Sequence, residues 1–122
     1  MSAKQATWIV DKSSGWDRKH FLDYLVKKKK LSDRVASNYV SRCNRVEKEL
    51  FVQLIEATKS EKNYVQLMQS ILDFACKNTK TVVAEYALAG TLRLAVRCFA
   101  EYQWGSVIKS YPRNYRATRR PR

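Results

Sequence analysis

The chain has 122 residues, enough for one domain, and 24 lysines and arginines against 11 acidic residues give it a net charge of +13. Only three glycines and two prolines leave few turn signals, which favours long helices over many short strands and makes all-α the expected class. No 18 apolar residues occur in succession and no apolar run of signal-peptide length opens the chain. We therefore expect a cytoplasmic protein with no membrane partner.

The positive charge is concentrated at the two ends of the sequence. Residues 1–52 hold twelve basic and six acidic side chains, residues 53–105 hold six and five, and residues 106–122 hold six and none. This asymmetry is typical of a polyanion binder, because each lysine or arginine set against a phosphate releases condensed counterions. A merely solubilising surface is the alternative, and the layout of the charge favours nucleic acid over it.

The first 30 residues predict an arm followed by a helix that ends in lysines. Residues 1–13 lack a helical period, and residues 7–10 favour extended conformation. Ser14 and Asp17 have capping-box spacing, which predicts a helix over about residues 15–28. The helix ends in a basic run of Lys27, Lys28, Lys29 and Lys30, where positive charge suits its C-terminus. Taken by itself, this run is typical of a solvated helix end. Because it lies next to the basic helix that follows, phosphate contacts are favoured instead.

Residues 31–54 predict a second helix with two dissimilar faces. Ser32 is placed to cap it, and Asp33 suits the positive end of the helix dipole. One apolar stripe, at spacings of four, four, three and four, is expected to face the core: Val35, Tyr39, Cys43, Val46 and Leu50. The opposite face carries groups able to bind phosphate or base edges: Arg34, Asn38, Ser41, Arg42, Arg45 and Lys48.

Three further helical segments follow. The turn after Leu50 lacks a glycine, so the end of the second helix is not defined by the sequence, and residues 53–58 predict a short helix. Ser60 is the next expected N-cap, before an apolar stripe from Tyr64 to Ala75. Residues 81–104 are apolar at nearly all azimuths, which predicts a centrally buried helix, with small residues allowing close approach of neighbours. Arg97 and Glu101 have salt-bridge spacing in it.

Residues 106–122 predict a basic tail or linker that is disordered or folds only on binding. They contain both prolines and no acidic residue. Tyr111 and Tyr115 alternate with arginines, so their rings could stack on bases while the cations contact phosphates. The arginines expected to contact nucleic acid are Arg113, Arg116, Arg119 and Arg120.

Nothing in the sequence predicts catalysis, a cofactor or a metal site. His20 is the single histidine and forms no motif with a serine, cysteine or aspartate, so a hydrogen-bonded packing role is expected. Phosphate-binding glycine motifs and paired-carboxylate segments do not occur. Cys43, Cys76 and Cys98 are widely spaced and lie at apolar helical positions, which favours reduced core residues over zinc ligands.

Residues 18–103 resemble the N-terminal core-binding, SAM-like domain of tyrosine recombinases and phage integrases. The similarity rests on the order FLDYLVKKKKLSDRVASNYVSRCNRVEKEL, VQLIEATKSEKNYVQLMQSI and YALAGTLRLAVRCFAEY. In the family a basic run and a leucine-serine start precede a YxxxLxRxE helix, matched here by Leu31, Ser32, Tyr39, Cys43, Arg45 and Glu47. The last helix echoes YxxALxxYxxF at Tyr86, Ala89, Leu92 and Tyr102. Phe51 departs from the pattern, because the family usually has glycine near this position.

The resemblance implies a compact bundle of four to five helices over residues 14–105 that grips duplex DNA. The catalytic domain of that family has no counterpart in these residues, so no tyrosine is assigned as a nucleophile. Two interpretations stay open. The chain is either the DNA-binding part of a longer recombinase or a standalone relative that binds DNA without cleaving it. Arg34, Arg42, Arg45 and Lys48 would hold phosphates, and Asn38 and Ser41 would reach base edges. A module that docks on an acidic protein or on a protein–nucleic acid complex is the alternative, and RNA is a third possibility.

Overall fold

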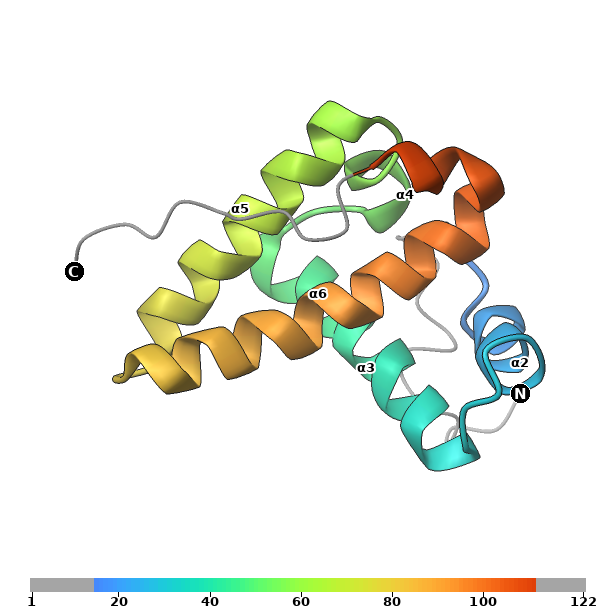
Figure 1. Ribbon diagram of the computed structural model, residues 1–122, viewed down its shortest axis with the longest axis horizontal. Coiled ribbons are helices and arrows are strands. Elements are labelled where there is room, and N and C mark those ends of the chain that lie inside the picture. Colours follow the sequence, from blue (N-terminus) through green and yellow to red (C-terminus); the bar gives the residue numbers. More distant parts are fainter. Residues whose placement is uncertain (1–14, 112–122) are drawn as a thin grey trace.

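The computed structural model describes residues 15–111, and every regular element in that part of the chain is helical (Figure 1). The elements are α2 (Arg18–Lys27), α3 (Asp33–Leu50), α4 (Leu54–Ala57), α5 (Glu61–Asn78), α6 (Val82–Trp104) and the 3₁₀-helix η1 (Gly105–Ser110). This arrangement confirms the predicted all-α bundle. The predicted arm, residues 1–13, lies outside the described residues.

Side-chain caps define where four of the helices begin. Ser32 and Ser60 each accept a hydrogen bond from the backbone N–H three residues later, at the start of α3 and α5, as predicted. Thr81 accepts in the same way at the start of α6, where the predicted segment begins. The start of α2 was predicted too early. Asp17 is its N-cap and accepts from the N–H of His20, so the helix begins at Arg18 rather than near residue 15.

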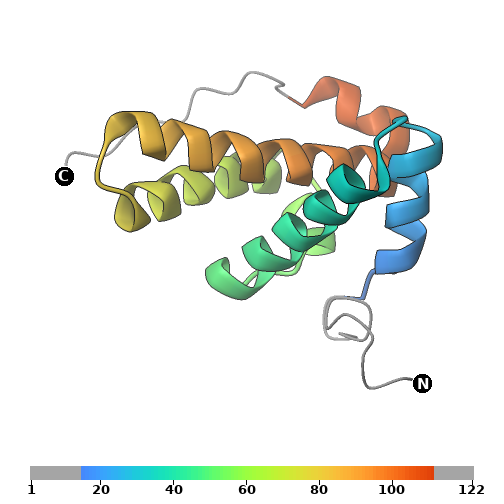
Figure 2. The same ribbon diagram turned by 90° about the horizontal axis from the view of Figure 1, so that it is seen from below.

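Helix α6 is the element around which the others pack. It lies side by side with α5, while α3 crosses it at an angle and α2 lies against its C-terminal half (Figure 2). Aromatic rings join α2 to α6, because Phe21 and Trp16 both pack edge-on against Phe99, with centroid distances of 5.6 and 4.9 Å. This aromatic packing fixes the orientation of α2 and of the turn that follows it, and therefore the direction in which their lysines point.

The buried stripe of α3 is shifted by one residue from the predicted one. Cys43 and Val46 are buried as expected, but Ala36 and Val40 fill the core in place of Val35, which is 38% exposed. Apolar residues form two adjacent stripes on this helix, and either stripe could face the core. The stripe with the smaller side chains faces the neighbouring helices. The opposite face keeps the predicted polar residues on the outside.

Helix α3 ends at a strained residue. Phe51 adopts the left-handed conformation (φ 54°, ψ 45°), its N–H bonds back to the carbonyl of Glu47, and its side chain is 93% exposed. Val52 N–H also reaches the Glu47 carbonyl, at 3.2 Å, which closes the helix in the manner usually served by glycine.

Replacing Phe51 with glycine is expected to stabilise the protein by about 0.5–1 kcal/mol, because the left-handed conformation is costly only for residues with a Cβ. Phe51→Ala removes the exposed ring but keeps the strain, so it should change stability little. Urea unfolding of the three proteins measures the difference. A loss of stability in Phe51→Gly would show that the ring makes a stabilising contact.

The predicted boundary of the C-terminal tail at residue 106 is wrong. Residues 105–110 form η1, which packs on α6 and buries Ile108. Tyr111 is also buried, and its hydroxyl donates to the carbonyl of Thr58 at 3.1 Å, so this ring is not free to stack on bases. The helical domain therefore extends at least to Tyr111.

The prediction that α6 is buried centrally holds only for its later residues. Residues 95–104 are buried or half-buried, but Val83, Tyr86 and Leu94, which come earlier in the helix, are 81%, 55% and 51% exposed. Of the small residues expected to bring neighbours close, Ala89 is buried, whereas Ala87 and Gly90 face outward. The N-terminal half of α6 extends with α5 away from α2 (Figures 1 and 2).

Candidate nucleic-acid interface

Helix α3 carries one polar surface, which we call the outer face of α3. Its members are Arg34, Asn38, Ser41, Arg42, Arg45 and Lys48, of which Arg42 is half-buried and the others are exposed. They lie opposite the buried residues of the helix, as a 3.6-residue period requires. The structure therefore brings all six residues predicted on this helix onto one side of it.

The cations of this face have no acidic partner in the described part of the chain. Within residues 15–111, no carboxylate oxygen lies within 4.0 Å of the charged nitrogens of Arg34, Arg42, Arg45 or Lys48. Glu49 is the one acid of α3 whose helical position falls on the same side, and it is exposed. Four positive charges against one negative charge leave the outer face of α3 attractive to a polyanion.

Glu47 does not neutralise this face, because its carboxylate is held inside the protein. Its Oε1 pairs with Arg18 Nη2 at 3.0 Å, and its Oε2 accepts from Trp16 Nε1 at 3.0 Å and from the N–H of Leu54 at 2.9 Å. Arg18 is 1% exposed, and its guanidinium also stacks on the Trp16 ring at 3.8 Å. The network fixes the start of α2 and the turn before α4 to the inner side of α3.

The buried pair Arg18–Glu47 was missed by the sequence analysis. A signal for it exists, because Arg18 lies three and seven residues before Phe21 and Leu25, which places a charged residue on the apolar side of α2. Such a position requires a buried partner. The sequence does not show which acid supplies it.

Two arginines of the outer face lie near aromatic rings. The guanidinium carbon of Arg42 is 5.7 Å from the centre of the Tyr39 ring, and that of Arg45 is 5.5 Å from the Phe74 ring of α5. Cation–π attraction at these distances limits the freedom of the long side chains without neutralising them. Among residues 15–111 no carboxylate oxygen lies within 4.0 Å of either guanidinium, so both remain available to an external acceptor.

The lysine corner, residues 27–30, lies at the end of α2. Lys27, Lys28 and Lys30 are exposed, and the positive φ of Lys30 (61°) lets the chain reverse into α3. Lys29 differs, because its Nζ pairs with Glu101 at 2.6 Å, and this hydrogen bond is the main cause of its raised pKa. Three of the four predicted lysines are therefore unpaired within residues 15–111, and Lys29 instead joins the corner to α6.

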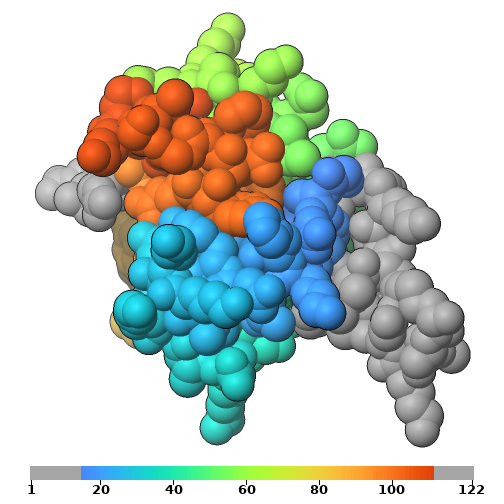
Figure 3. All heavy atoms as spheres, turned by 90° about the vertical axis from the view of Figure 1, so that its right-hand side faces the viewer, coloured from blue at the N-terminus to red at the C-terminus, as the bar shows by residue number. Residues whose placement is uncertain are grey.

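A shallow depression of about 280 Å³ adjoins the lysine corner. Its lining consists of His20, Asp23, Tyr24, Lys27, Lys28 and Tyr102. His20 Nδ1 and the Tyr102 hydroxyl share a hydrogen bond of 2.7 Å, so the histidine has the predicted hydrogen-bonded role. Figure 3 shows this end of the molecule, where α2 and the turn to α3 (blue to cyan) lie beside the last turns of α6 (orange).

The remaining candidate residues, Arg113, Arg116, Arg119 and Arg120, lie outside the described residues. The two arginines of α6 point to carbonyls of their own chain, because Arg93 Nη2 donates to Met68 O and Arg97 Nη2 donates to Ile108 O. Arg97 also forms the predicted ion pair with Glu101, at 3.5 Å.

The three cysteines are free thiols, and two are buried. Burial raises the pKa of the Cys43 thiol well above its ordinary value of 9.0, and burial is also the main cause of the raised pKa of Cys98. Within residues 15–111, no group of three or more histidine, cysteine or acidic side chains could hold a metal ion.

Stability is expected to be flat from pH 7 to about 9 and to fall above it. The thiols of Cys43 and Cys98 ionise near 9.0 when unfolded but at higher pH when folded, so the folded state binds more protons in that range. The raised pKa of Lys29 acts in the same direction above its ordinary 10.5. Urea unfolding at pH 7, 9 and 10.5 tests this; rising stability at alkaline pH would contradict it.

No protein-family model, no curated protein and no solved structure matches this chain. In residues 15–111, none of the helices is long and apolar enough to cross a membrane. The interpretation of the outer face of α3 and of the lysine corner as binding surfaces is therefore based on their geometry and charge.

Proposed function

We propose that the chain is a non-catalytic helical module that binds duplex DNA through the outer face of α3. The observation that carries the proposal is the set of Arg34, Arg42, Arg45 and Lys48, four cations on one side of one helix with no carboxylate within 4.0 Å among residues 15–111. A protein surface that served only solubility would intersperse both signs of charge.

The shape of α3 fits the proposed ligand. Its 18 residues make a rod about 27 Å long, and the major groove of B-DNA admits an α-helix. In this arrangement the four cations contact phosphates, and the exposed Asn38 and Ser41 between them are the candidates for base edges. Lys27, Lys28 and Lys30 extend the positive surface beyond the start of the helix.

The resemblance to core-binding domains suggests a more specific role. In that role the module would hold DNA for a tyrosine recombinase or integrase, either as part of one or as a standalone relative. The helical bundle is compatible with this role, and the six residues of the outer face would act as proposed in either case.

A fluorescent duplex titrated with the protein tests the proposal against the docking of an acidic protein. We expect saturable binding to the duplex, with polyglutamate of equal total charge displacing it only weakly. Equal or better competition by polyglutamate would favour an acidic protein partner. Tighter binding to double-stranded RNA of the same sequence would favour RNA.

A further inference from the structure

Residues 83–94 of α6 place exposed apolar side chains on one side of the helix, which we call the 83–94 face. Val83 is 81%, Tyr86 55% and Leu94 51% exposed, and the outward-facing Ala87 and Gly90 lie between them. These positions recur at helical spacing and lie opposite the buried side of α6, so α6 has two apolar sides and its own fold covers one. A helix that is apolar on both sides is typical of one that is buried on both.

Gly90 indicates that another backbone approaches this face closely. Glycine is unfavourable in the interior of a helix, yet a Cβ placed at residue 90 would meet nothing within 4 Å, and the backbone there is ordinary helix. The fold of the described chain therefore gives no reason for glycine at the centre of the face. A second helix crossing at this point does give one, because the absence of a side chain lets the two backbones come near.

The spacing around Gly90 makes the face complementary to itself. Tyr86 and Leu94 lie four residues before and four residues after Gly90. If two copies pair their α6 helices antiparallel about a two-fold axis at Gly90, Tyr86 of each copy lies against Leu94 of the other. We propose that the 83–94 face is a self-association surface on which two copies of this chain pair through their α6 helices.

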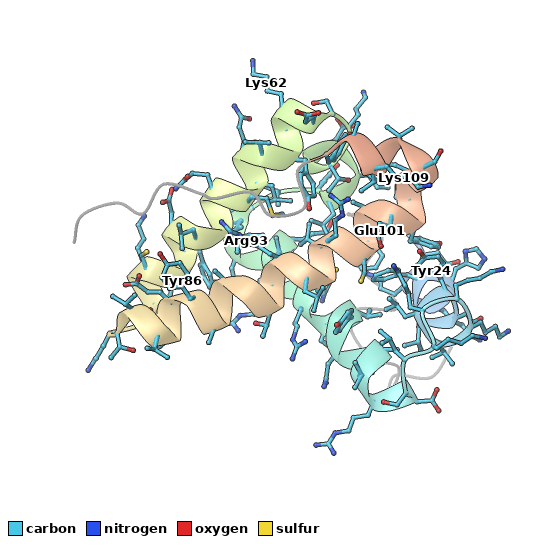
Figure 4. The ribbon with its side chains drawn as sticks, viewed as in Figure 1. Tyr24, Lys62, Tyr86, Arg93, Glu101 and Lys109 are labelled. Atoms are coloured by element: carbon cyan, nitrogen blue, oxygen red, sulfur yellow. The ribbon has the colours of Figure 1, made fainter. Side chains whose placement is uncertain are left out.

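The distribution of charge favours the 83–94 face over the rest of the surface for contact between copies. The charge of +13 on each copy opposes self-association, and the repulsion is weakest at the 83–94 face, because none of its members is charged. The neighbouring Arg93 is turned to the Met68 carbonyl of its own chain at 3.1 Å (Figure 4). A nucleic acid, in contrast, would bind the cations on α3 and leave this face uncovered.

The small size of the face predicts a weak association. Three helical turns offer well under the roughly 800 Å² that each partner contributes to a standard stable interface. We therefore expect a reversible dimer that forms only at high micromolar to millimolar concentrations of the protein. The proposal concerns the free protein and does not depend on DNA binding.

Sedimentation equilibrium from about 10 μM to 1 mM tests the dimer. The weight-average mass of the wild type should rise from 14.3 kDa towards twice that value. Leu94→Glu should remain monomeric over the same range. Val107→Glu is the matched control, because Val107 is 58% exposed on η1 outside the face, and it should associate like the wild type.

Gly90→Ala separates the interface from folding. Alanine favours the helix, so this variant should melt at a higher temperature, while the added Cβ at the crossing point weakens association by about tenfold or more. A wild type that stays monomeric at 1 mM would overturn the proposal. So would Gly90→Ala or Leu94→Glu associating like the wild type, or Val107→Glu losing association to the same extent.

Discussion

Replacing Glu47 with alanine is expected to lower the free energy of unfolding by about 3–5 kcal/mol, because the change removes the carboxylate that pairs with the buried Arg18 guanidinium. Arg18 is 1% exposed, and the Glu47 side chain is 8% exposed. The same carboxylate also accepts from Trp16 Nε1 and from the N–H of Leu54, so its loss leaves two further donors without their acceptor.

Urea unfolding measures this effect, with Glu49→Ala as the matched control. Glu49 lies two residues farther along α3 and is exposed, so its removal should change stability by less than about 0.5 kcal/mol. Glu47→Gln should fall between the two, since the amide keeps one acceptor oxygen but not the charge. If Glu47→Ala were as stable as Glu49→Ala, the buried network would not hold α2 and α4 to α3 as described.

Reversing two charges on the outer face of α3 is expected to weaken binding to duplex DNA by roughly a hundredfold or more, about tenfold for each arginine changed to glutamate. Arg42→Glu combined with Arg45→Glu replaces two phosphate-binding groups with two that repel phosphate. Neither guanidinium has a carboxylate within 4.0 Å among residues 15–111, so no internal ion pair is lost. Fluorescence anisotropy measures the affinity, and circular dichroism confirms that the variant is folded.

The control for this double variant carries the same change of charge elsewhere. Lys62 at the start of α5 and Lys109 in η1 are both exposed (Figure 4), and Lys62→Glu with Lys109→Glu should lower the affinity far less. Equal losses in the two double variants would mean that net charge, and not the outer face of α3, governs binding.

Local signals predicted most of the helices correctly. Ser32, Ser60 and Thr81 act within their own first turns, so a capping residue before an apolar stripe is visible in the sequence. The outer face of α3 was also predicted from a local signal, because the helical period alone places its residues on one side of the helix. Its use in binding DNA stays a prediction.

Features set by distant parts of the chain were predicted poorly. The apolar residues of α3 fit two neighbouring stripes, and packing against the other helices selected Ala36 and Val40 over Val35. Tyr111 was placed in a free tail, because nothing in its own segment shows that its hydroxyl meets Thr58, 53 residues earlier. The ion pairs of Arg18 with Glu47 and of Lys29 with Glu101 are likewise long-range.

The salt dependence of duplex DNA affinity tests the central proposal most directly. If Arg34, Arg42, Arg45 and Lys48 each neutralise one phosphate, log K should fall against log salt with a slope of roughly −3.6, and Arg42→Glu with Arg45→Glu should flatten it by about half. Contacts from the lysine corner would make the wild-type slope steeper. Binding that is insensitive to salt, or no detectable binding at low salt, would contradict the assignment of this face to DNA.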